Sequence, residues 1–194
     1  MNSDSLIIED LDVVILIGGL GKRLRSVQKN TPKCMAIVNG RPFIDFLIDY
    51  YISQGIRKFI LCVGYLRDSI LSHLSKRTDC EISFSIESKQ LGTAGAIKNA
   101  EKHFRSENHL IINGDSFCDF PLHSLIKYHS NKKSFITMVV TTETNIKDYG
   151  SVTFDKKNKL VSFNEKIDSG KGYVNAGIYL FSNDTLNYIP KKKK

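Results

Sequence analysis

Short apolar runs alternate with amphipathic segments through the first two thirds of the chain. Residues 13–17 form a continuous apolar run that ends directly in glycines, which is typical of a strand buried on both faces. A segment that opens at Pro42 and stops at Gln54 and Gly55 has the apolar spacing of a helix. Residues 58–63 form the next apolar run. Together these segments predict a strand–helix–strand unit.

The alternation continues along the chain. The pattern predicts helices over 66–74, 93–104 and 122–129, and strands over 81–86 and 110–112. Strands that alternate with helices pair in parallel through crossover connections. We therefore expect a largely parallel sheet with helices on both faces.

The last third of the chain is richer in β-forming residues. Strands are predicted over 134–141, 151–154, 160–163 and 174–181, and residues 155–159 suggest a hairpin between the middle two. The sequence shows no internal repeat and no low-complexity linker. We expect residues 1–194 to form one α/β domain, a Rossmann-like, doubly wound mixed sheet with a small antiparallel addition.

The formal net charge of +8 favours an anionic partner without identifying it. Much of the excess is spread over pairs such as Lys132-Lys133 and the lysine run at 191–194. Because no basic helix or aromatic-interleaved basic stripe accompanies it, nucleic acid is not the expected partner.

The cysteines and the first residues indicate a cytoplasmic protein. Cys34, Cys62, Cys80 and Cys118 form no Cys-x-x-Cys pair, so neither a zinc site nor a redox motif is expected. The first residues are polar and acidic, without the basic and apolar regions of a signal peptide, and no membrane-spanning segment is predicted.

A glycine-rich segment, residues 18–25, directly follows the first predicted strand and reads Gly-Gly-Leu-Gly-Lys-Arg-Leu-Arg. Glycines let backbone N–H groups approach an anion, and Lys22, Arg23 and Arg25 add positive charge, so a phosphate site is expected. A dinucleotide fingerprint would need glycine or alanine at Leu24, and a Walker loop would need serine or threonine at Arg23. A glycine-rich turn with solvated basic residues is the alternative.

Residues 31–35, Thr-Pro-Lys-Cys-Met, add a lysine stiffened by a preceding proline. With the glycine loop, this segment resembles the opening of the sugar-phosphate nucleotidyltransferase family, whose signature is Gly-x-Gly-Thr-Arg-Leu followed by Pro-Lys-Pro-Leu/Met. The chain has Lys22 in place of the threonine and Cys34 in place of the second proline. It keeps Arg23 and Lys33, the basic residues that the family uses.

The resemblance continues in order along the chain. Each further segment alone has an ordinary explanation as a helix start, a turn or a surface ion pair. The matching segments are Leu91 to Ala96, Asn113-Gly114-Asp115, Tyr149-Gly150, Glu165-Lys166 and Asn175 to Tyr179. Their wording is most similar to that of bacterial heptose 1-phosphate guanylyltransferases, although mannose 1-phosphate guanylyltransferases and glucose 1-phosphate thymidylyl- or uridylyltransferases share the core segments.

The resemblance implies a nucleotide-diphospho-sugar transferase fold and transfer of a nucleoside monophosphate from a nucleoside triphosphate, with GTP favoured, to a sugar 1-phosphate. The implied product is GDP-heptose or a related activated sugar for surface polysaccharide synthesis. The resemblance also admits a homo-oligomer. It implies that Arg23 and Lys33 hold the triphosphate and the attacking phosphate, that Asp115 binds Mg²⁺, and that Lys166 anchors the sugar phosphate. The implied nucleotide contacts are Gly18, Gly19, Gly21, Lys22, Gly92, Thr93 and Gly114, and the implied sugar-phosphate contacts are Gly150, Glu165, Lys166 and Asn175.

The sequence departs from the family at its end. The family's later strand with a second metal-binding aspartate has no counterpart here, which suggests a truncated member. A non-catalytic module that binds nucleotide or sugar phosphate is therefore an alternative. A dinucleotide-dependent oxidoreductase is disfavoured by Leu24, and a molybdenum-cofactor guanylyltransferase by the segments around Lys166 and Asn175.

Overall fold

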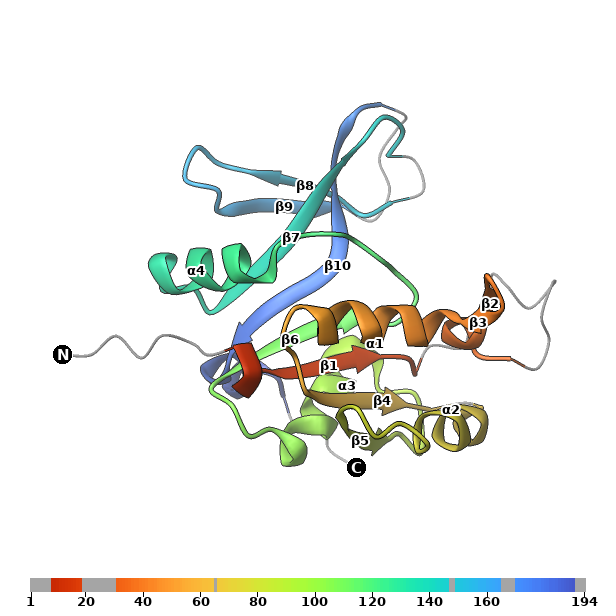
Figure 1. Cartoon of the computed structure of the whole chain (residues 1–194). Coiled ribbons are helices and arrows are strands. Elements are labelled where there is room, and N and C mark those ends of the chain that lie inside the picture. Colours follow the sequence, from red (N-terminus) through yellow and green to blue (C-terminus); the bar gives the residue numbers. More distant parts are fainter. Residues whose placement is uncertain (1–7, 19–30, 65, 147–148, 165–169, 191–194) are drawn as a thin grey trace.

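The computed structural model describes residues 8–18, 31–64, 66–146, 149–164 and 170–190 (Figure 1). Its α-helices are α1 (Phe43–Ser53), α2 (Arg67–Leu74), α3 (Gly92–Ala100) and α4 (Leu122–Lys132). Its strands are β1 (Asp12–Leu16), β2 (Ile37–Val38), β3 (Arg41–Pro42), β4 (Lys58–Val63), β5 (Glu81–Ile86), β6 (Asn108–Asn113), β7 (Ile136–Glu143), β8 (Ser151–Phe154), β9 (Leu160–Asn164) and β10 (Gly172–Ser182). The 3-10 helices are η1 (Ile8–Asp10), η2 (Lys33–Met35), η3 (Glu101–His103) and η4 (Asn183–Tyr188). None of the helices in these ranges is long and apolar enough to cross a membrane.

The first half of the chain forms the parallel part of the main sheet. Strands β5, β4, β1 and β6 lie side by side in that order, and each pair is parallel. The chain moves outward from β1 to β4 and β5, and then returns through α3 to the other side of β1. The direction of winding therefore reverses between β1 and β6, which confirms the predicted doubly wound sheet.

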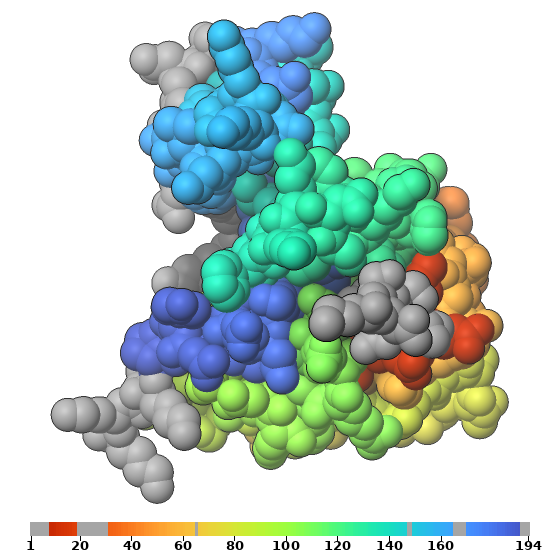
Figure 2. Space-filling model, turned by 90° about the vertical axis from the view of Figure 1, so that its left-hand side faces the viewer, coloured from red at the N-terminus to blue at the C-terminus, as the bar shows by residue number. Residues whose placement is uncertain are grey.

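The second half adds antiparallel strands, as predicted. Strand β7 pairs with β10 near both of its ends, β6 pairs with the C-terminal end of β10, and β8 pairs with its N-terminal end, while β9 completes a hairpin with β8. The pairing of β10 with β7 shifts between Asn175 and Tyr179, so a bulge separates the two ends of the strand. In the space-filling view, the β8–β9 hairpin stands off the α/β body (Figure 2).

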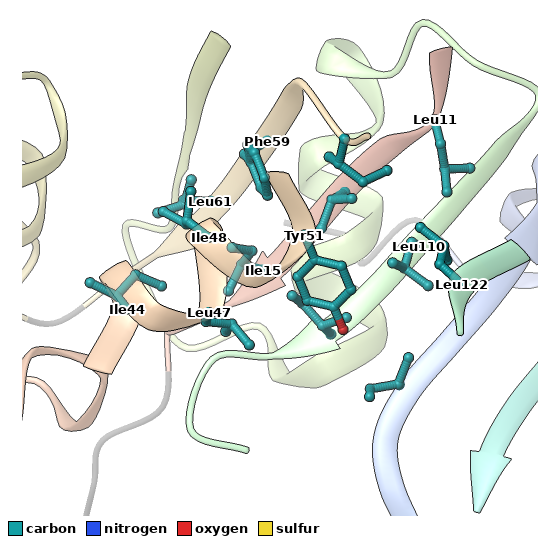
Figure 3. Packing of buried hydrophobic residues seen from close by; sticks show 14 of the residues in the cluster. Leu11, Ile15, Ile44, Leu47, Ile48, Tyr51, Phe59, Leu61, Leu110 and Leu122 are labelled. Atoms are coloured by element: carbon teal, nitrogen blue, oxygen red, sulfur yellow. The ribbon is translucent and has the colours of Figure 1, made fainter. Parts of the chain in front are cut away.

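Alternate residues of β1 face two hydrophobic layers. Val13 and Ile15 belong to the layer that contains α1, α2 and α4, whereas Val14 belongs to the layer formed with α3 and η4. In the first layer, Tyr51 of α1 is fully buried together with Phe59 of β4 (Figure 3). Because the sheet is covered on both faces, its inner parallel strands β4, β1 and β6 contain continuous apolar runs, whereas the edge strand β5 alternates polar and apolar residues.

The sequence missed a short hairpin and misplaced two helix ends. The strands β2 and β3 are joined by Asn39 and Gly40, which both have positive φ, as an Asn-Gly hairpin turn requires. The helix predicted over 93–104 leaves the α conformation after Ala100 and continues as η3. Helix α4 extends beyond its predicted end to Lys132, where Lys133 in the left-handed region ends it.

Candidate active site

A cavity of about 300 Å³ opens where β1 and β6 end. This edge is the place where open α/β sheets bind ligands, because the helices on either side of a reversal in winding diverge there. The cavity is lined by the ends of two strands, by η2 and by the start of α3. The lining residues are Leu16, Ile17, Gly18, Lys33, Cys34, Glu87, Gln90, Gly92, Thr93, Ala96, Asn113, Gly114 and Asp115.

Two glycines allow the strand ends to pack closely at this edge. The N–H of Gly114 donates to the carbonyl of Leu16 at 3.0 Å, and a Cβ on Gly114 would lie 2.7 Å from Cγ2 of Ile17. A Cβ on Gly18 would lie 2.7 Å from Oε1 of Glu87. Since real Cβ atoms do not approach other atoms so closely, a larger residue at either glycine would displace the cavity wall.

The structure brings together Lys33 and Asp115, which are far apart in sequence. Nζ of Lys33 donates to Oδ2 of Asp115 at 3.2 Å. Their side chains are 30% and 45% exposed, so both reach into the open part of the cavity. The backbone of η2 is held by a hydrogen bond from Met35 N–H to the carbonyl of Pro32, and its Cys34 side chain is buried in the core. Burial raises the pKa of the Cys34 thiol to about 12, so this thiol acts as a packing group.

Helix α1 holds the loop that carries Asp115. The hydroxyl of Tyr50 accepts a hydrogen bond from Phe120 N–H at 2.7 Å and lies within donating distance of the Phe120 carbonyl and of Asp119 Oδ1. Gln54 Oε1 accepts a hydrogen bond from Leu122 N–H at 2.8 Å. Because α1 also directly follows the η2 and β2–β3 segment, the same helix supports both partners of the Lys33–Asp115 ion pair.

Glu87 is a cavity residue that the sequence analysis missed. It follows β5 directly and is only 7% exposed. Its Oε2 accepts a hydrogen bond from Leu91 N–H at 3.2 Å. Burial raises the pKa of its carboxyl above the ordinary value, and the bond from Leu91 offsets only part of this effect. Its position between the end of a predicted strand and the segment at 91–96 is the sequence feature that could have identified it.

The start of α3 offers backbone N–H groups to the same cavity. The helix begins at Gly92, which has a φ of +72°, and its N-cap residue Leu91 makes no side-chain capping bond. Thr93 therefore lies inside the helix. Gly92 and Thr93 both line the cavity, and an uncapped helix start is suited to a phosphate group.

Gly150 and Asn175 lie next to each other but outside the cavity lining. The N–H of Asn175 donates to the carbonyl of Gly150 at 3.0 Å. The side chain of Asn175 accepts from Gly177 N–H at 2.9 Å and donates to the hydroxyl of Tyr179 at 2.6 Å. Gly177, with a φ of +74°, packs so closely against Asn113 that a Cβ would lie 2.6 Å from its Nδ2. This contact links the predicted sugar side to the cavity wall.

Several predicted site residues lie outside the described part of the chain. These are Gly19, Gly21, Lys22, Arg23, Glu165 and Lys166. Their roles stay predictions.

The residues at the cavity fit a magnesium ion that shares its coordination with a nucleotide. Within the described ranges, no group of three or more His, Cys, Asp or Glu side chains is placed to hold a metal ion. Of the two carboxylates in the cavity lining, Glu87 is almost completely buried, whereas Asp115 is exposed enough to meet a metal ion. This donor set suits Mg²⁺, which is commonly held by one or two carboxylates together with substrate phosphates and water.

The reversal in winding and the cavity at the strand ends define a doubly wound α/β protein with a ligand site at its switch point. A comparison with family models identifies the branch of this class. The model described as "Nucleotidyl transferase" matches residues 12–194, so the chain belongs to the nucleotidyl transferase family. This confirms the prediction of a nucleotidyltransferase enzyme.

Individual relatives agree with this assignment. The chain is 36% identical over 185 residues to the D-glycero-alpha-D-manno-heptose 1-phosphate guanylyltransferase of Campylobacter jejuni subsp. jejuni, covering 95% of this chain and 81% of that protein. It is 33% identical to the mannose-1-phosphate guanylyltransferase catalytic subunit beta of Drosophila melanogaster, covering 92% of this chain and 50% of that protein. Its structure is similar to that of HddC from Yersinia pseudotuberculosis in complex with GMP-PN, with a TM-score of 0.85, 34% identity, and coverage of 95% and 82% of the two chains.

Proposed function

We propose that the chain transfers GMP from GTP to a heptose 1-phosphate, giving GDP-heptose and pyrophosphate, with Mg²⁺ as the metal ion. The observation that carries this proposal is a single cavity that contains Lys33, Asp115, Glu87 and the start of α3. The guanylyltransferase relatives support the choice of nucleotide, and the heptose 1-phosphate relative supports the choice of sugar. As part of the proposal, the enzyme acts in the cytoplasm and supplies an activated sugar for surface polysaccharide synthesis.

The buried carboxylate of Glu87 favours guanine among the nucleotide bases. Guanine presents two neighbouring donors, N1–H and the N2 amino group, and a carboxylate presents two acceptor oxygens. Uracil and thymine would instead place carbonyl oxygens against the same carboxylate, and the mismatch of buried polar groups is costly. Leu91 N–H uses only part of the acceptor capacity of Glu87, so the carboxylate can accept further hydrogen bonds.

The transfer requires positioning and charge neutralisation more than proton transfer. A phosphate oxygen of the sugar phosphate forms a bond to the α-phosphorus, while the bond to the bridging oxygen breaks and pyrophosphate leaves. The attacking phosphate monoester is already ionised near pH 7, so no general base is needed. Lys33 would neutralise phosphate charge, and Asp115 would hold Mg²⁺, which supplies further neutralisation when bound.

The decisive assay measures pyrophosphate release by the purified chain. GTP, UTP, dTTP, CTP and ATP are each tested against heptose, mannose and glucose 1-phosphates, with Mg²⁺ and with EDTA. We expect Mg²⁺-dependent pyrophosphate release with GTP and a heptose 1-phosphate. Asp115→Ala should lose turnover, and Lys33→Ala should bind the nucleotide more weakly. Pyrophosphate release with another sugar 1-phosphate, but not with a heptose 1-phosphate, would contradict the heptose assignment. Nucleotide binding without any pyrophosphate release would favour the non-catalytic module.

A further inference from the structure

Lys33 and Asp115 contact each other, although the proposed function gives each a different partner. Lys33 is proposed to meet a phosphate of the nucleotide, and Asp115 is proposed to meet the metal ion. In the structure, Nζ of Lys33 lies 3.2 Å from Oδ2 of Asp115. Binding of a metal–nucleotide complex must therefore exchange this ion pair for two new contacts.

A metal ion and the Lys33 ammonium compete for the same carboxylate. Mg²⁺ binds a carboxylate oxygen at about 2.0–2.1 Å, so an ion on Asp115 would stand within a few ångströms of Nζ. Two cations at that separation repel each other strongly in a partly enclosed cavity. The lysine must consequently leave Asp115 when a metal ion binds, and a phosphate oxygen is the partner that can receive it.

We propose that the Lys33 ammonium occupies the carboxylate of Asp115 until the metal–nucleotide complex binds. The metal ion then takes its place on Asp115, and Lys33 moves to a phosphate of the nucleotide. This inference rests on the proposed function, because it uses the same two ligands. Metal alone would break the ion pair and give the lysine no new partner. Metal-free nucleotide would draw the lysine away and leave Asp115 facing phosphate charge. Only the complex satisfies both residues, so metal and nucleotide binding are positively coupled, and the coupling is reciprocal.

The surroundings of the ion pair support this exchange. Both side chains are partly exposed, so each can change partner without unpacking the core. Their backbones are fixed by η2 and by the hydrogen bonds of Tyr50, which keep the side chains within reach of one another. Within the described residues, no cluster of three metal-ligating side chains is placed to hold the ion without the nucleotide.

The first experiment measures metal binding without nucleotide. Mn²⁺ replaces Mg²⁺ as the probe, and free Mn²⁺ is followed by electron paramagnetic resonance in the full chain and in Lys33→Met. We expect Lys33→Met to tighten Mn²⁺ binding at least about fivefold, because it removes both the competing ion pair and the repulsion between cations. Lys33→Arg, which keeps a cation, should bind Mn²⁺ as the unchanged chain does.

A matched control is available at the opposite end of the sheet. Lys58 at the start of β4 is also 30% exposed and lies 3.8 Å from a carboxylate oxygen of Asp10. Lys58→Met should change the Mn²⁺ affinity less than about twofold, because only distant, screened charge is removed. In the Lys33→Met background, Asp115→Asn should abolish the gain in Mn²⁺ affinity.

The second experiment measures the reciprocal effect on nucleotide binding. With EDTA present, metal-free GTP should bind Asp115→Asn about fivefold more tightly than the unchanged chain, since Lys33 is released and a negative charge is lost. The same substitution in the Lys33→Met background should give a smaller gain, which a double-mutant cycle quantifies.

The outcomes separate this inference from the proposed function. Unchanged or weaker Mn²⁺ binding by Lys33→Met would overturn the exchange, as would a gain in affinity that survives Asp115→Asn. If no sugar 1-phosphate supports pyrophosphate release, the proposed function fails. The two affinity changes can still be measured in that case, and they alone decide whether the exchange occurs.

Discussion

Glu87 lies directly against the backbone of Gly18, since a Cβ on Gly18 would stand 2.7 Å from its Oε1. Gly18 follows β1 and Glu87 follows β5, the two strands on either side of β4, and both residues line the cavity. The missing side chain at Gly18 therefore makes room for a carboxylate that is almost completely buried. This contact connects a glycine of the predicted phosphate site with the residue that we propose selects the base.

Glu87→Gln is expected to weaken selection of guanine. Glutamine keeps the size of the side chain but replaces one acceptor oxygen by a donor, which would face a guanine N–H. We expect kcat/KM for GTP to fall about 10- to 100-fold, with a smaller loss for UTP or dTTP. Glu81→Gln, at the opposite end of β5, serves as the control. An equal loss for all nucleotides would show that Glu87 does not read the base.

Gly18→Ala tests the close contact itself. The added methyl group would displace the Glu87 side chain and should lower stability by about 1–3 kcal/mol, measured by urea unfolding. We also expect weaker GTP binding, because the carboxylate would leave its position. Gly170→Ala is a suitable comparison, since a Cβ there meets no atom within 4 Å. If the two alanine variants have the same stability and the same GTP affinity, the Gly18–Glu87 contact contributes to neither.

The sequence predicted the parallel strands well, because the inner strands such as β1 and β4 are buried on both faces and the edge strand β5 alternates polar and apolar residues. The apolar run at 58–63 and the alternating segment at 81–86 have the same bounds as β4 and β5. The ends of helices were less predictable, because they depend on single backbone conformations such as the left-handed Lys133 after α4. The short β2–β3 hairpin was missed, since two-residue strands leave almost no periodic pattern, although its Asn-Gly turn was visible.

The sequence identified several residues of the site but not the contacts between them. Motif order identified Lys33 and Asp115, but only the fold shows that they form an ion pair. Glu87 carries no motif of its own and becomes notable because the structure buries it beside Gly18. Asn175 was assigned to the sugar side, yet its side chain is engaged with Gly177 and Tyr179 in the bulge of β10. Such local bonding cannot be deduced from residue type.

Tyr50→Phe is expected to loosen the loop that carries Asp115. The substitution removes the hydroxyl that accepts from Phe120 N–H and lies beside Asp119. The Mg²⁺ concentration for half-maximal activity should rise about 3- to 10-fold, in keeping with loss of an interaction that orients a metal ligand, while the KM for the sugar phosphate changes little. Tyr188→Phe, at a highly exposed tyrosine, is the control. A uniform loss of activity at every Mg²⁺ concentration would argue against a positioning role for Tyr50.

Asp12 is expected to govern acid stability from the opposite end of β1. Its side chain is buried, and Oδ2 accepts hydrogen bonds from the N–H groups of Arg105 and Ser106 at 2.6 and 3.0 Å. Burial alone would raise the pKa of Asp12, but the neighbouring His109 and the hydrogen bonds from Arg105 and Ser106 outweigh burial and lower the pKa to about 2.

A carboxyl whose pKa is lower in the folded chain stabilises the fold above its unfolded pKa of 3.8, and this contribution is lost as the pH falls toward 2. The shift corresponds to about 2–3 kcal/mol. Asp12→Asn should therefore lose roughly this much stability at pH 7 and show a flatter decline between pH 4 and about 2, measured by urea unfolding across pH. Asp184→Asn, on an exposed residue of η4, is the control. If Asp12→Asn and the unchanged chain lose stability in parallel over this range, another group controls the acid transition.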